Sequence, residues 1–128
     1  MEGAKGTSLV QVMADFIEQG LVENIVIMFK RDPSLYPLTG ELLRDPRFMV
    51  RMGVSILFED LAVVRPDDIA LAVPSLLPLL NDHTAHVRGE AVNMLGIIGT
   101  EEALRHVARM VDDPDPQVSE IARDILSA

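Results

Sequence analysis

The feature that most constrains the fold of this 128-residue chain is a segment that occurs three times. The central copy begins at Asp82, and related copies begin 37 residues earlier at Asp45 and 31 residues later at Asp113. In each copy a valine follows five residues after the aspartate, and small or apolar residues follow at plus nine, plus twelve and plus thirteen. This spacing places the apolar side chains on one side of an α-helix. Repetition of such a unit predicts stacked helices that share one core.

A second apolar segment precedes each of these helices. The three preceding segments are residues 38–44, 74–80 and 102–111. The connection inside each pair is short and rich in proline and aspartate, which is typical of two antiparallel helices joined by a tight turn. The chain is therefore expected to consist of helix pairs.

Residues with capping chemistry mark the predicted helix ends. Thr84 and Asp115 stand where a second helix should begin, and both are favoured N-cap residues. Pro116 then occupies a first helical position, where its missing N–H is not needed. Gly99 is expected to end one helix and Thr100 to cap the next.

The N-terminal quarter departs from the repeat. The segment from Ser8 to Gln11 has a capping-box pattern, which predicts a helix to about Gln19 that Gly20 ends. A second helix is expected over residues 21–31, with Leu21, Ile25, Met28 and Phe29 on one face.

The predicted fold is all-α: an α-α superhelix of about four helix pairs. A longer link over residues 63–73, with a helical turn that starts at Asp67, explains the unequal repeat spacing. The whole chain, 1–128, is expected to form a single domain. Its units are a divergent N-terminal pair at 8–34 and repeats at 35–64, 67–99 and 100–127.

The repeated pattern resembles HEAT repeats. The resemblance is carried by leucine pairs after a proline, as at Pro74, and by an aspartate followed by Val87, Arg88 and a Leu95-Gly pair. It covers residues 74–126 well and 38–62 in part. The short repeat length is similar to that of the phycobilisome-lyase-type members.

The resemblance implies a right-handed stack with the first helices on the convex face and the second helices on the concave face. It also implies that an aspartate column and an arginine column form a structural ladder between neighbouring repeats. These columns are Asp45, Asp82, Asp113, Arg51 and Arg88. Ser119 replaces the arginine in the third copy, which suits a terminal unit with no following repeat.

Composition excludes several function classes. The net charge is −9, and the basic residues are spread singly along the chain, so no nucleic-acid partner is expected. There is no cysteine, which excludes disulfides and thiolate chemistry. No apolar run is long enough for a membrane span, and no signal peptide is evident, so a cytoplasmic protein without a membrane partner is expected.

Candidate catalytic and metal-binding residues are few. His83, His86 and Glu90 have side chains that zinc accepts, but His83 precedes the helix that carries Glu90, and solvated loop histidines are the favoured interpretation. Phosphate-binding loops and nucleophile elbows are absent. We therefore expect no enzyme activity, no catalytic residue, no metal and no cofactor.

The methionines allow two interpretations. Met94 and Met110 fall on the apolar side of their helices and are expected in the core. For Met49 and Met52 the alternatives are core packing and an adaptable binding surface.

Together these features predict a protein-interaction adaptor or regulatory scaffold without catalytic activity. The alternative is an accessory enzyme or a ligand-handling protein, such as a chromophore-lyase-like or metal-dependent factor. If the second helices face the partner, the expected contact residues are Arg51, Ser55, Arg88, Asn93 and Arg123. The consecutive apolar residues 25–29 predict that the N-terminal pair either packs deeply against the repeats or forms a homodimer contact.

Overall fold

The structure is a computed structural model that describes the backbone of residues 2–128 and the side chains of residues 9–128. Every element in this described part is helical, and no strand occurs in it. The α-helices are α1 (Glu2–Glu18), α2 (Val22–Arg31), α3 (Thr39–Leu43), α4 (Phe48–Val64), α5 (Val73–Leu76), α6 (Ala85–Ile98), α7 (Glu101–Ala108) and α8 (Pro116–Ser127). Three 3-10 segments join them: η1 (Pro33–Leu38), η2 (Ile69–Ala72) and η3 (Leu77–Asn81).

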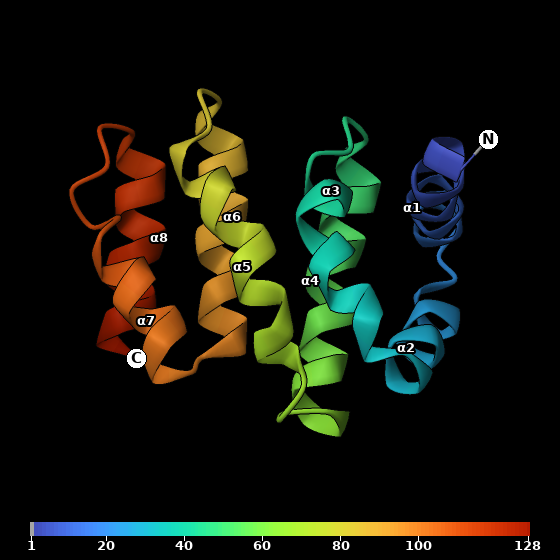
Figure 1. The fold of residues 1–128 in the computed structure, drawn as a ribbon. Helices are drawn as coiled ribbons and strands as arrows, with labels where there is room; N and C mark the ends of the chain where they lie inside the picture. The colour runs from blue at the N-terminus through green and yellow to red at the C-terminus, as the bar shows by residue number, and fades with distance from the viewer. Residues whose placement is uncertain (1) are drawn as a thin grey trace.

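The helices form two layers, as expected for an α-α superhelix. Figure 1 shows α4, α6 and α8 side by side in one layer and α3, α5 and α7 in the other, with the two termini at opposite ends of the stack. Within the first layer α6 packs against both α4 and α8. The prediction of stacked helix pairs is confirmed.

The first helices are shorter than the sequence analysis predicted. Residues 38–44 form only the five-residue α3 after a 3-10 segment, and residues 74–80 are divided between α5 and η3. Prolines explain the division, because Pro37, Pro74 and Pro78 lack the N–H that a continuing α-helix requires. The second helices contain no internal proline and are correspondingly long.

The predicted caps are largely confirmed. Asp115 accepts hydrogen bonds from the backbone N–H groups of Gln117 and Val118, and Thr100 accepts one from Ala103. Gly99 ends α6 with a left-handed φ of 67°, which a glycine adopts without strain. Thr84 begins α6 as predicted, but its side chain makes no cap hydrogen bond.

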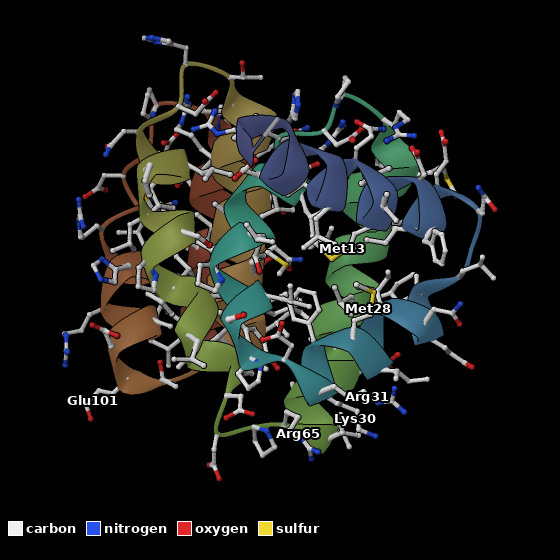
Figure 2. All side chains as sticks on the ribbon, turned by 45° about the vertical axis from the view of Figure 1, so that its right-hand side comes forward. Met13, Met28, Lys30, Arg31, Arg65 and Glu101 are labelled. Carbon is white, nitrogen blue, oxygen red and sulfur yellow. The ribbon has the colours of Figure 1, made fainter. Side chains whose placement is uncertain are left out.

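The N-terminal pair crosses the end of the stack instead of continuing it. Figure 2 shows α1 and α2 running across the direction of the repeat helices, and both helices pack on α4. α1 begins at Glu2 and not at Ser8, whose side chain lies outside the described residues. Gly20, at a φ of 84°, ends α1 as predicted.

The α2 helix buries only part of its predicted apolar face. Ile25 and Phe29 are fully buried, and Phe29 meets the Tyr36 and Phe58 rings edge-on at centroid distances of 4.9 and 6.4 Å. Leu21, which was expected on the same face, is exposed. The aromatic cluster joins the N-terminal pair to the first regular repeat.

Candidate functional site

Two arginines join successive repeats in the same way. The Nη1 group of Arg51 donates to the carbonyls of Asp45 and Pro46, and the Nη1 group of Arg88 donates to those of Asp82 and His83. Each guanidinium thereby fixes the loop that precedes its own helix. Its remaining N–H groups reach an acidic residue of the next repeat.

The link between the last two repeats is a buried ion pair. Nε and Nη2 of Arg88 donate to the two carboxylate oxygens of Asp113 at 2.9 and 3.0 Å. The side chains are only 14% and 4% exposed. The hydrogen bonds from Arg88 hold the pKa of Asp113 below its usual range, and the same contact raises the pKa of Arg88. The pair is the ladder contact that the HEAT resemblance implied.

One step earlier in the stack the ladder partners differ from the expected columns. Nε of Arg51 donates to Glu90 at 3.0 Å and does not reach Asp82, because Asp82 accepts from Arg44 at 2.7 Å. The Asp82 carboxylate also accepts from the Thr84 N–H at 2.9 Å, which fixes the turn that leads into α6. These hydrogen bonds, led by that of Thr84, lower the pKa of Asp82.

Ser119 takes over part of the arginine's role in the terminal unit. Its buried hydroxyl donates to the carbonyl of Val111 in the preceding loop at 2.7 Å. The loop is therefore fixed to α8 without a guanidinium.

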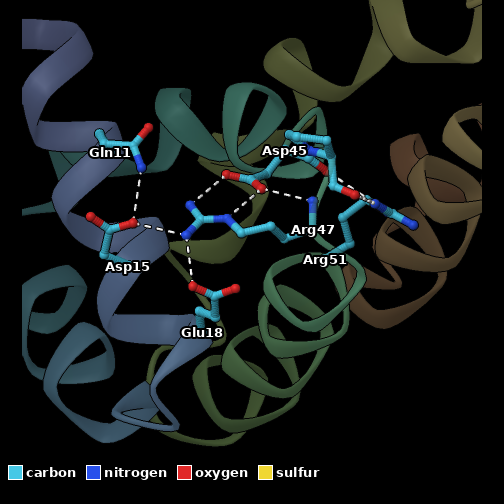
Figure 3. Close-up of polar contacts among 7 residues, drawn as sticks. Gln11, Asp15, Glu18, Asp45, Arg47 and Arg51 are labelled. Carbon is cyan, nitrogen blue, oxygen red and sulfur yellow. Dashed lines mark hydrogen bonds and ion pairs between the residues drawn. The ribbon is translucent and has the colours of Figure 1, made fainter.

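An arginine that the sequence analysis did not single out as structural joins the N-terminal pair to the stack. Figure 3 shows Arg47 bound by both oxygens of Asp45 and, through Nη1, by Asp15 and Glu18 of α1 at 2.9 and 2.8 Å. These hydrogen bonds, with Asp45 the strongest contributor, raise the pKa of Arg47. The contact from Arg47 lowers the pKa of Asp45. No local pattern reveals the contact with α1, because Asp15 and Glu18 lie 32 and 29 positions from Arg47 in the sequence.

The five predicted partner-contact residues fall into two groups. Arg51 and Arg88 are held in the ladder. Ser55 and Asn93 face one another across α4 and α6, with Asn93 Nδ2 at 3.4 Å from Ser55 Oγ, and Arg123 is exposed on α8. Asn93 also lines a hollow of about 290 Å³ between α6 and α8, together with His86, Glu90 and Gln117.

The exposed face of α4 carries an apolar stripe that the sequence analysis did not identify. Met49, Met52, Ile56 and Val63 are 53, 40, 44 and 80% exposed. Their spacing of three, four and seven residues places them on one line along the helix. Met94 and Met110 are buried, as predicted, whereas the exposure of Met49 and Met52 contradicts the core alternative for these two residues.

Two hollows lie beside this stripe. One, of about 420 Å³, lies among the α1–α2 turn, the start of α2 and α4, and the other, of about 370 Å³, lies between α2 and the end of α4. Glu23 and Asp60 line both hollows, which are therefore adjacent. We call the combined surface the α2–α4 groove. Its lining includes Leu21, Glu23, Ile27, Met52, Ile56, Asp60 and Val63.

Among the described residues, no group of three or more His, Asp or Glu side chains is arranged to hold a metal ion. The candidate ligands His83, His86 and Glu90 form no such group, and the Oε2 atom of Glu90 accepts from Arg51. Among the helices formed by residues 2–128, none combines the length and apolar character that a membrane span requires.

The repeat geometry agrees with a comparison to known families. The family model for HEAT repeats matches residues 59–127, which is more than half of the chain. The chain belongs to the HEAT-repeat family. Repeats of this family generally mediate protein–protein interactions, and this match does not extend to the phycobilisome-lyase-type subgroup. No curated protein and no solved structure matches the chain.

Proposed function

We propose that this HEAT-repeat chain is an adaptor or regulatory scaffold that binds another protein and catalyses no reaction. The observation that carries the proposal is that some side chains hold the repeats together while others form an exposed surface. The ladder arginines are used inside the molecule, while the exposed sides of α4, α6 and α8 present apolar and polar groups next to one another. Such a continuous surface on stacked helices is how solenoid proteins bind partners.

We further propose that the five predicted contact residues have two roles. Ser55, Asn93 and Arg123 lie on the second helices and are expected to meet the partner directly. Arg51 and Arg88 are expected to act through the shape of the surface, since their N–H groups hold successive repeats together. In this proposal one domain comprises the N-terminal pair and the repeats at 35–64, 67–99 and 100–127.

An affinity experiment in extract of the native cell tests the adaptor function. The bait is the wild-type chain, and the test variant is Asn93→Ala/Arg123→Ala. The matched control is Asn81→Ala/Arg105→Ala, which removes the same two residue types from exposed positions on the first helices. Arg88 is left intact because its loss would disturb the fold.

A protein retained by the wild type and the control, and lost with the test variant, supports the adaptor. Retention of the same proteins by all three baits contradicts a contact role for Asn93 and Arg123. Retention of no specific protein contradicts the adaptor function itself.

A ligand-handling role is the alternative, and the hollow of about 290 Å³ between α6 and α8 favours it. This volume is near the lower end of the range for small-molecule sites. A bound chromophore or metal in protein purified from its native cell, detected by absorbance and elemental analysis, would support this alternative over the adaptor.

A further inference from the structure

We infer that the α2–α4 groove binds one basic, amphipathic helix of the partner protein. This inference rests on the adaptor function proposed above and names the chemistry of the partner segment. In this groove an exposed apolar stripe, two adjacent hollows and a pair of carboxylates coincide.

The shape of the groove fits a helix. α4 has 17 residues and is therefore about 25 Å long. The four residues of its apolar stripe run from Met49 to Val63, so the stripe extends along nearly the whole helix. A partner helix with anchors at i, i+3, i+4 and i+7 would place its apolar side against such a line. An extended peptide that binds by strand addition would instead need an unpaired strand edge, and the described part of the chain has no strand.

The charge of the groove selects a basic occupant. Glu23 and Asp60 line both hollows and are exposed. Their carboxylates attract lysine or arginine side chains next to the apolar line, and the net charge of −9 favours approach of a basic segment.

The same charges disfavour a second copy of this chain as the occupant. In a two-fold dimer the same surface meets itself. Glu23 and Asp60 of one copy would then lie near those of the other, and juxtaposed like charges oppose association. Lys30, Arg31 and Arg65 gather at the C-terminal ends of α2 and α4 (Figure 2), beyond the middle of the groove that these two acids line.

The methionines indicate how selective the groove is. Met49 and Met52 have unbranched, polarisable side chains that adapt to different apolar partners. A surface of this kind recognises a class of amphipathic helices more than one sequence. The wall of the groove beside α1 is closely packed, since Gly53 lies so close to Ile17 that an added Cβ would overlap it.

A designed peptide tests the inference directly. The probe is a fluorescently labelled helix of about 16 residues, enough to follow the groove. It carries leucine at i, i+3, i+4 and i+7 and lysine at most other positions. The companion peptide has glutamate in place of each lysine. Binding of both peptides to the full chain is measured by fluorescence anisotropy at low and high salt.

Variants with matched controls locate the binding. Ile56→Glu and Asp60→Lys change one apolar and one acidic position of the groove. Each is expected to weaken binding of the lysine peptide at least about tenfold. Leu71→Glu and Asp124→Lys make the same kinds of change at exposed positions outside the groove, and binding should stay within about twofold. Hydrogen exchange of the wild-type complex should show new protection in α2 and α4, which needs no variant.

The expected result is salt-sensitive binding of the lysine peptide, little binding of the glutamate peptide and losses confined to the groove variants. Equal binding of both peptides, equal losses with the control variants or protection outside α2 and α4 would overturn the inference. A concentration-dependent dimer in sedimentation that Ile56→Glu dissociates would also overturn it, and would assign the groove to contact between copies. If the peptide fails while the Asn93/Arg123 surface still retains a partner, the adaptor function stands without this groove.

Discussion

Removal of the Arg88 side chain should destabilise the last repeat more than any exposed substitution does. In Arg88→Ala the Asp113 carboxylate, only 4% exposed, loses both guanidinium hydrogen bonds. The loop carbonyls of Asp82 and His83 lose their donor as well. Breaking a buried ion pair by removing one partner costs about 3–5 kcal/mol.

The expected cost lies near the lower end of that range, at about 3 kcal/mol, because the buried carboxylate keeps one partner. Asp113 still accepts the Asp115 N–H at 2.9 Å, and solvent can enter where the arginine was. Such a loss is a large fraction of the total stability of a domain, which is about 5–15 kcal/mol. The melting temperature should fall by roughly 10 °C for a chain of this size.

The loss should also be localised. Stacked repeats contact only their neighbours, so the α7–α8 pair should open before the rest of the molecule. Urea unfolding measures the free energy, and hydrogen exchange of Arg88→Ala should show lost protection in α8 with α4 still protected. The control is Arg105→Ala, whose pair with Glu101 is 66% and 91% exposed and should contribute little.

A double-mutant cycle with Asp113→Asn separates the pair from the rest of the truncation. If Arg88→Ala costs no more than Arg105→Ala, or if protection is lost uniformly along the chain, the ladder does not hold the repeats together. The same experiment decides whether Arg88 belongs in any test of partner binding, since a variant that opens α8 would lose partners for structural reasons.

Further outcomes follow from individual contacts. Asp113→Asn should destabilise the protein at neutral pH. The difference from wild type in the free energy of urea unfolding should shrink as the pH falls through the folded-state pKa of Asp113. This pKa is held below 3.8, and the carboxylate stabilises the fold only while it is ionised. Tyr36→Phe should stabilise the fold by about 1 kcal/mol, because the buried Tyr36 hydroxyl has no hydrogen-bond partner among the described residues. Burial raises the pKa of this single tyrosine from 10.0 to about 12, with a smaller contribution from Asp68, so wild-type stability should fall above pH 10 and ultraviolet titration should show late ionisation. Gly40→Ala should lower the free energy of urea unfolding by about 1–3 kcal/mol, because the added Cβ would overlap the Ser75 carbonyl. Gly89→Ala should leave the stability unchanged or raise it, because its Cβ would make ordinary contacts at 3.4 Å.

The parts of the fold that the sequence predicted well are those with local causes. The start of α8 follows from Asp115 and Pro116, and the end of α6 follows from Gly99, because each cap is decided by a few neighbouring residues. The Arg88–Asp113 link, between residues 25 positions apart, was predictable through the HEAT resemblance, which implied contacts between the arginine and aspartate columns of neighbouring repeats. The Arg47 cluster could not be predicted in this way, since Asp15 and Glu18 belong to the N-terminal helix pair, which does not follow the repeat.

The α2–α4 groove shows why hydrophobic periodicity alone could not predict the whole candidate site. α4 is apolar on two sides, with Val54 and Leu57 buried and Met52 and Ile56 exposed, so the sequence contains two interleaved stripes of the same chemistry. Periodicity cannot say which stripe faces the core, because that depends on where α2 crosses. The crossing is set by Gly53 and by the aromatic cluster, which are long-range contacts. A helix in the middle of a stack normally buries one stripe; the second stripe of α4 stays exposed because the N-terminal pair crosses the stack, and this irregular arrangement creates the groove.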